Sequence, residues 1–183
     1  REYIETKWDI LEPIFLLIKN LKYIPCLEIN DDICRDFLDY NAWNIMLLDE
    51  KSDKNLYKYA VQKNGYVLED IPKELIDYDM CLEAVKQNGE VLQHVPDEYK
   101  DENMCLEAFK NNSESFIFIP NNIKTKKMCE IAIQNDGIFL EHVPKKYITK
   151  KLCEIAINNN GYSLYSVPDK YKIKELCIKA MKQ

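Results

Sequence analysis

Residues 80–112, MCLEAVKQNGEVLQHVPDEYKDENMCLEAFKNN, hold one pattern twice, and the second copy starts 24 residues after the first. The same interval connects a column of cysteines and a column of prolines along most of the chain. These columns are Cys81, Cys105, Cys129, Cys153 and Cys177, and Pro72, Pro96, Pro120, Pro144 and Pro168. Repetition in register over five units indicates an internal repeat, which decides how the rest of the sequence is interpreted.

The first part of each repeat has the pattern of an amphipathic helix. Met80, Cys81, Ala84 and Val85 follow the spacing i, i+1, i+4, i+5, which forms one apolar stripe on a helix and does not alternate as a strand would. A polar residue that can cap the helix precedes each stripe, in the column Thr6, Asn30, Asp53, Asp77, Asp101, Thr125 and Thr149, which only Ile173 breaks. We therefore predict a helix over residues 78–88.

The second part of each repeat predicts a shorter element. Gly89, Leu92 and Val95 are three residues apart, which fits a helix of one or two turns, of the α or 3₁₀ type. Pro96 ends it, and residues 97–100 form a polar connector. We expect Gly89 and its equivalents to adopt the left-handed conformation that commonly ends a helix.

A helix and a short helix of 24 residues cannot bury their own apolar stripe, so each unit must pack on its neighbours. The predicted fold class is therefore all-α, an α-solenoid of about seven helix–short-helix repeats. We expect one continuous solenoid, with degenerate capping repeats over residues 1–52, five regular repeats over residues 53–172 and a terminal half repeat over residues 173–183.

The spacing of the cysteines argues against disulfides and metal binding. Equivalent positions in stacked helices lie about 8–10 Å apart, beyond the roughly 7 Å limit between the Cα atoms of a disulfide. No close CxxC pair of the kind that binds zinc is present. We expect buried, reduced thiols, which indicates an intracellular location. Cys26 and Cys34 lie off the column, and their place is left open.

Residues that could carry catalysis are scarce. The sequence has no phosphate-binding glycine loop, no HExxH and no GxSxG, and its only two histidines, His94 and His142, share one column two repeats apart. We therefore predict no enzyme, no cofactor, no catalytic residue and no metal site. The asparagines before the glycines are interpreted as helix caps, although asparagine ladders in some solenoids bind peptide backbones.

Charge is distributed unevenly along the 183 residues, whose formal net charge is −6. Residues 77–100 contain six acids against two lysines, whereas residues 149–183 contain seven lysines against three acids. This polarity could steer a bipolar partner or favour head-to-tail self-association, or it could reflect drift on a solvated surface. An acidic chain makes nucleic-acid binding a weak expectation, and the longest apolar run, residues 14–18, is too short to span a membrane.

Some side chains break the polar pattern of their columns. Ile117 and Phe118 are apolar where other repeats carry Gln-His or Glu-His, and Met46, Leu47 and Tyr165 are similar exceptions. Exposed apolar groups mark interfaces, or else they are covered by a neighbouring side chain. Together with the two histidines they form the candidate partner-binding set: Met46, Leu47, His94, Ile117, Phe118, His142 and Tyr165.

Residues 80–112 and the run CEIAIQNDGIFLEHVPKKYITKKLCEIAINNNG (129–161) resemble a tandem repeat family of unknown function from giant DNA viruses of amoebae, of the mimivirus type. Members of that family carry EAVKQNGxxLxxVP segments, often drawn as a doubled unit. The resemblance covers residues 53–182 well and residues 6–52 weakly, and Ser113 stands where the family has glycine. It implies an intracellular α-helical repeat protein with no catalytic residues.

The function that these patterns favour is a non-enzymatic protein–protein interaction module, viral in origin and acting inside the host cell. Repetition creates a long surface and leaves no unique pocket for catalysis. Two alternatives remain: a nucleic-acid-binding solenoid that uses the basic C-terminal half, and a structural or virion-associated rod that associates end to end.

Overall fold

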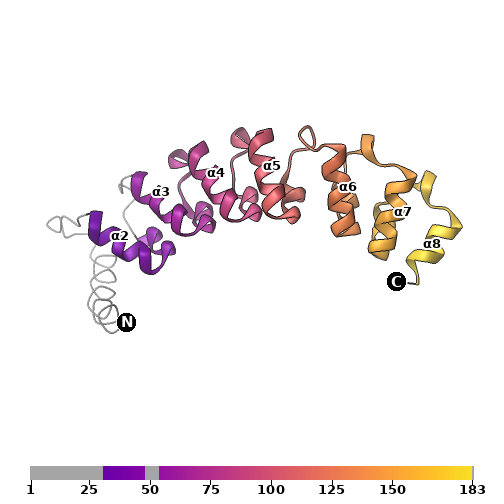
Figure 1. Cartoon of the computed structure of the whole chain (residues 1–183), viewed down its shortest axis with the longest axis horizontal. Helices are drawn as coiled ribbons and strands as arrows, with labels where there is room; N and C mark the ends of the chain where they lie inside the picture. The colour runs from indigo at the N-terminus through magenta and orange to yellow at the C-terminus, as the bar shows by residue number, and fades with distance from the viewer. Residues whose placement is uncertain (1–30, 48–53, 183) are drawn as a thin grey trace. The chain divides into compact units, whose positions relative to one another are not determined.

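The computed structural model in Figure 1 describes residues 31–47 and 54–182, and those residues form helices joined by short turns. The chain divides into two compact units, Arg1–Ala84 and Val85–Gln183, and each is described by itself. The expected division into capping, regular and terminal repeats stays a prediction. The caps expected at Thr6, Asn30 and Asp53, and the place of Cys26, lie outside the described residues.

In the first unit, α-helices alternate with 3₁₀ helices. Its elements are α2 (Asp31–Tyr40), η1 (Ala42–Leu47), α3 (Lys54–Lys63), η2 (Gly65–Asp70), η3 (Lys73–Leu75) and the start of α4 (Tyr78–Gln87). The helix predicted over residues 78–88 is therefore confirmed to within one residue. The unit boundary falls within α4.

The second unit continues the same alternation. Its elements after α4 are η4 (Gly89–Gln93), η5 (Asp97–Tyr99), α5 (Glu102–Asn111), η6 (Ser113–Phe118), α6 (Lys126–Asn135), η7 (Gly137–His142), η8 (Lys145–Tyr147), α7 (Lys150–Asn159), η9 (Gly161–Ser166), η10 (Asp169–Tyr171) and α8 (Lys174–Ala180). No strand occurs among the described residues. The predicted fold class, an all-α solenoid of helix–short-helix repeats, is confirmed, and the expected polar connector forms a further 3₁₀ turn in most repeats.

The α-helices begin where the cap column predicts. Asp101 accepts a hydrogen bond from the backbone N–H of Met104 at 2.7 Å, and Thr149 accepts one from that of Leu152 at 3.2 Å. Asp77 and Thr125 cap their helices in the same way. Ile173 makes no side-chain cap, as its apolar side chain requires.

The asparagine column caps the helices expected, and it also caps the ones that follow. Asn112, Asp136 and Asn160 are the C-caps of α5, α6 and α7. The Oδ1 atom of Asn88 accepts from the backbone N–H of Glu90 at 2.9 Å, so Asn88 begins the 3₁₀ helix that follows it. Asn41, Asn64, Asn112, Asp136 and Asn160 do the same. The capping interpretation is therefore confirmed, and Asn112, Asp136 and Asn160 each end an α-helix through the backbone N–H and begin the next 3₁₀ helix through the side chain.

The conformation predicted for the glycines is wrong. No described residue, glycine included, has a positive φ. Glycine is needed for a different reason, because a Cβ atom built on Gly65 would lie 2.8 Å from the carbonyl oxygen of Ala84. Gly89 and Gly137 press in the same way against the carbonyl oxygens of Ala108 and Ala156. The glycine column therefore marks where a 3₁₀ helix touches the α-helix of the next repeat.

The cysteine column lies in the core. Cys81, Cys105, Cys129 and Cys153 are fully buried and Cys177 is half-buried, and none of the five is in a disulfide. Cys34 belongs to this column after all: it is buried and is the fourth residue of α2, as Cys81 is of α4. Cys34 precedes the equivalent position, Tyr57, by 23 residues, one fewer than the regular period.

Neighbouring repeats of the second unit are also joined by a second asparagine column, which the sequence did not single out. Asn111, the last residue of α5, donates from Nδ2 to the carbonyl oxygen of Lys86 at 2.8 Å and accepts from the backbone N–H of Gly89 at 2.9 Å. Asn159 donates likewise to the carbonyl oxygen of Gln134 at 2.7 Å. These amides satisfy carbonyl groups that a helix end leaves unpaired.

Candidate interaction surfaces

A row of exposed apolar side chains lies on the 3₁₀ helices of the second unit. We call it the 3₁₀ ridge, and it consists of Ile117 on η6, Ile138 on η7, and Tyr162 and Tyr165 on η9. Tyr162 and Tyr165 are 75% and 86% exposed, so almost nothing in the chain covers them. Ile117 and Tyr165 were predicted from their columns, whereas Ile138 and Tyr162 were missed because their column varies too much to look exceptional.

The other apolar residues around Ile117 do not belong to this surface. Phe116 is fully buried, and its ring contacts those of Phe109 and Phe139 with centroids 6.1 and 6.3 Å away. Ile119 is buried, and Phe118 is half-buried at the position that His94 and His142 occupy in their repeats. Of the apolar run, only Ile117 is exposed.

The two histidines lie in different elements. His94 follows η4 and is half-buried, and His142 ends η7 with its Nε2 atom 2.9 Å from Oε1 of Glu141. Since η6 packs between η4 and η7, the two rings do not form one site. Within residues 31–47 and 54–182, no three His, Cys, Asp or Glu side chains are grouped to hold a metal ion. Met46 and Leu47 end η1, and their side chains lie outside the described residues.

Lys124 is buried, which sequence reasoning missed. Its ammonium group donates to the carbonyl oxygen of His142 at 2.9 Å and lies 4.6 Å from the centre of the Phe116 ring. Burial lowers the pKa of Lys124. The side chain thereby ties the loop before α6 to the end of η7.

A pattern within the repeat could have indicated this lysine. Where Lys100 and Lys172 stand in the same column, an aspartate three residues earlier accepts a hydrogen bond from the ammonium group. Asn121 takes that place for Lys124, at 3.4 Å. Where the column holds isoleucine, Ile76 and Ile148, the residue three positions earlier is a lysine. The column therefore holds either a local polar pair or an apolar side chain.

A groove of about 690 Å³ lies between α5 and α6. Its walls include Leu106 and Phe109 on α5 and Met128 and Ile131 on α6, and Ser113 lies on its lining. Ser113 stands where other repeats have the glycine that touches the next α-helix. Its side chain prevents that close approach, and its Oγ instead accepts a hydrogen bond from Nδ2 of Asn135 at 2.8 Å. A second hollow, of about 700 Å³, lies beside Tyr162, Tyr165 and Met181.

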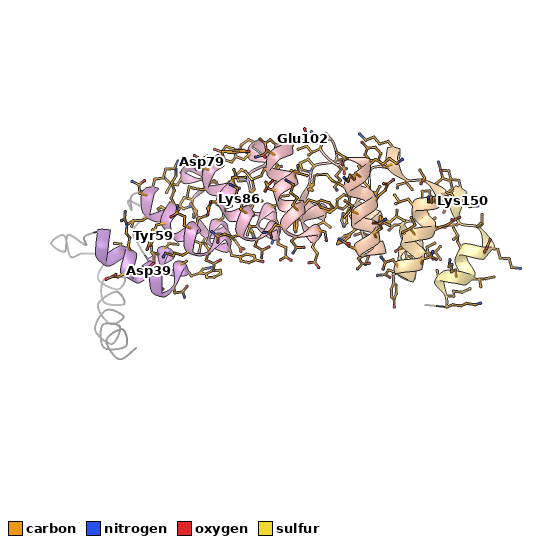
Figure 2. All side chains as sticks on the ribbon, in the orientation of Figure 1. Asp39, Tyr59, Asp79, Lys86, Glu102 and Lys150 are labelled. Carbon is orange, nitrogen blue, oxygen red and sulfur yellow. The ribbon has the colours of Figure 1, made fainter. Side chains whose placement is uncertain are left out.

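Charged side chains follow one edge of the second unit, where the connectors and the first turns of the α-helices lie. Glu102 and Lys150 mark this edge in Figure 2. Its acidic part, the acidic edge, consists of Asp97, Glu98, Asp101 and Glu102. Its basic part, the basic edge, consists of Lys126, Lys127, Lys145, Lys146, Lys150 and Lys151, all exposed. In the connectors and first helical turns of residues 120–151, no residue is acidic.

The basic edge is poorly compensated within the chain. Lys126 and Lys150 face Glu130 and Glu154 at 3.8 Å, at the outer limit of an ion pair, and Lys146 lies over the ring of Tyr147. Lysines in a first helical turn oppose the helix dipole, which favours acids there. The edge can therefore attract anions but adds nothing to the stability of α6 and α7.

Comparison with known proteins identifies a repeat family but no function. A family model described as a domain of unknown function (DUF4116) matches residues 77–124 and 101–148. The two matches overlap and are offset by one repeat, so each spans two repeats. No curated protein and no solved structure matches the sequence. None of the described helices is long and apolar enough to cross a membrane. The middle of the chain is thus similar to a tandem repeat family of unknown function.

Proposed function

We propose that the chain is a non-enzymatic protein–protein interaction module, a helical repeat scaffold that binds another protein. The observation that carries this proposal is the 3₁₀ ridge. Its apolar side chains stand at positions where other repeats of the chain carry polar residues, so the fold does not require them there. Apolar groups that a fold exposes without need indicate an interface.

The basic edge supports the same function with a second kind of contact. Charged groups at the rim of an interface steer a partner and set its orientation, while the apolar groups supply most of the affinity. A repeat scaffold offers equivalent side chains at regular intervals, whereas catalysis needs one asymmetric cluster. We therefore place binding, rather than chemistry, on these surfaces.

We also propose a viral origin and an intracellular setting. The origin follows from the resemblance of residues 80–112 and 129–161 to the repeats of giant viruses. The setting follows from thiols that are buried and are not in disulfides, which suits a reducing compartment.

The ridge is tested by affinity capture with the full chain at near-physiological salt. The wild type should recover a protein partner, and Ile117→Ser combined with Tyr165→Ser should lose it. Ile173→Ser is the matched control, because Ile173 is a similarly exposed isoleucine at the N-cap of α8 and lies on none of the 3₁₀ helices that carry the ridge. Recovery of no partner, or equal recovery by the ridge variant, contradicts the proposal.

A second candidate function, nucleic-acid binding, is favoured by the six lysines of the basic edge. A phosphate backbone that contacts several lysines binds with an affinity that falls steeply with salt. Gel-shift titrations with single-stranded RNA at about 50 and 200 mM salt test this candidate. Salt-sensitive binding that Lys146→Glu with Lys150→Glu abolishes would favour it over a protein partner.

A further inference from the structure

The acidic edge and the basic edge are the same backbone feature with opposite charges. The acidic edge consists of a one-turn 3₁₀ helix, η5, followed by the first turn of α5, and residues 145–151 of the basic edge consist likewise of η8 and the first turn of α7. Corresponding positions two repeats apart invert their charge: Asp97 corresponds to Lys145, Glu98 to Lys146, and Glu102 to Lys150. One edge is therefore complementary in charge to the other, and both have the same local shape.

The charges on both edges are largely available to a partner. Glu98 and Glu102 are exposed and form no ion pair within the described part of the chain, and the same holds for Lys145 and Lys151. Asp97 is partly compensated by Lys100 at 2.9 Å, yet its side chain is 90% exposed. The basic edge of a second copy carries lysines with the same spacing as the acids of the acidic edge, because both edges follow the same repeat.

We propose that the chain forms a two-fold homodimer in which the acidic edge of each copy docks on the basic edge of the other. The segment 121–127, which carries Lys126 and Lys127 of the basic edge, lies midway along the chain between residues 97–102 and residues 145–151, so the two-fold axis passes beside it. Each copy then contributes both edges, and the contact closes as an isologous pair. This partner goes beyond the proposed function, because the dimer uses the charged edges and not the 3₁₀ ridge that carries that function.

The centre of this arrangement is less charged than its ends. Asn121 and Asn122 stand at the positions of Asp97 and Glu98, and both are exposed and neutral. Lys126 and Lys127 of both copies lie near this centre, and Glu130, 3.8 Å from Lys126, offsets only part of their repulsion. Exposed ion pairs are individually weak and are screened by salt, so the dimer should form at high protein concentration and low ionic strength.

Sedimentation velocity of the full chain tests the proposal. At about 20 mM salt the wild type should shift from monomer to dimer as its concentration rises to several hundred micromolar, and about 500 mM salt should weaken the dimer at least tenfold. A wild-type chain that stays monomeric throughout at low salt overturns the proposal.

Two charge-swap variants identify the surfaces. Glu98→Lys, Glu102→Lys and Asn103→Lys together make residues 97–103 net positive. Lys146→Glu, Lys150→Glu and Lys151→Glu together make residues 145–151 net negative. Each substitution introduces a residue of the charge that the fold already carries at that repeat position, so both variants should keep the wild-type circular dichroism spectrum. Each alone should stay monomeric, and an equimolar mixture should form the heterodimer. Lys179→Glu with Lys182→Glu, a charge reversal on exposed residues outside both edges, should dimerise as the wild type does.

The same reagents separate this proposal from the broader function. If the mixture fails to associate, the homodimer is wrong. Binding of a poly-glutamate peptide to the wild type, and not to the variant in which residues 145–151 are net negative, would then still support an acidic protein partner. Binding of single-stranded RNA in the same assay would instead favour nucleic acid. Failure of the capture experiment on the 3₁₀ ridge would overturn the proposed function without affecting the dimer.

Discussion

Gly137 shows how little space separates neighbouring repeats. A methyl group at this position overlaps with the backbone carbonyl oxygen of Ala156, which cannot move without shifting α7. We expect Gly137→Ala to lower the free energy of unfolding by about 1–3 kcal/mol, the usual cost of overpacking. Urea denaturation measures this loss. Gly161→Ala, at a half-buried glycine, is the control and should cost much less; equal losses would refute the close-contact explanation.

Lys124 should be replaceable by the isoleucine that two other repeats carry in its column. Lys124→Ile removes a buried charge and leaves the carbonyl oxygen of His142 without its donor, and these effects oppose each other. We expect a net change within about 1.5 kcal/mol. Because the folded-state pKa of Lys124 is lowered, the wild type should gain stability relative to the variant as pH rises through that pKa toward 10.5. Thermal melts at pH 7 and pH 10 would show the opposite trend if Lys124 were stabilised as a cation.

The buried cysteines should be unreactive in the native protein. Burial raises the pKa of Cys105 and Cys129 to about 11, so almost no thiolate exists at pH 8. Among the cysteines of residues 31–47 and 54–182, half-buried Cys177 should be alkylated first. Peptide mapping after brief treatment with iodoacetamide, with and without denaturant, gives the order of modification. Labelling of Cys105 ahead of Cys177 in the native state would contradict the burial.

At the scale of the element, Ser113 controls how closely α6 approaches α5. Ser113→Gly should let the junction close as the other glycine junctions do, because no Cβ then blocks the approach. Ser113→Ala keeps the Cβ and loses only the hydroxyl, so it is the matched control. We expect weaker binding of an apolar dye by the glycine variant and wild-type binding by the alanine variant. Equal fluorescence titrations of the two variants would show that the Cβ does not open the groove.

The start of α4 should make the first unit sensitive to acid. Burial raises the pKa of Asp77, but Lys54 at 2.8 Å, the backbone N–H of Met80 and Lys58 outweigh burial and lower that pKa to about 2. The stabilisation is therefore present above the ordinary pKa of 3.8 and is lost as pH falls from there toward 2. Asp77→Asn should show a smaller loss of stability over this interval in urea titrations. A parallel pH dependence of the two proteins would exclude this role.

At the scale of the whole molecule, the features that depend on neighbours in sequence were predictable. The start of a helix can be predicted because the capping side chain lies within one turn of the first apolar residue of the helix, as Asp101 and Met104 illustrate. The exposure of Tyr165 followed from a comparison of equivalent positions. The repeat supplied that comparison inside a single chain.

Features that depend on contacts between repeats were not predictable in the same way. The glycine column was explained by a local conformation, whereas its cause is the carbonyl group of a residue 19 positions further along the chain. The burial of Lys124 depends on a carbonyl group 18 residues away. The opposite charges of residues 97–102 and 145–151 were visible as a difference in composition. Their placement on one edge required the backbone.

The local pairing of Lys100 with Asp97 has a consequence for how such a chain can grow. Both members of the pair lie in one repeat, so a duplicated gene segment inherits the counter-charge together with the lysine. The contact of Gly137 with Ala156, by contrast, joins two successive copies and is restored wherever identical modules are spliced in tandem. A module that carries serine in the glycine position brings an open junction to any new location. Evolution can therefore lengthen the array, and place its openings, by copying whole modules without compensating point mutations.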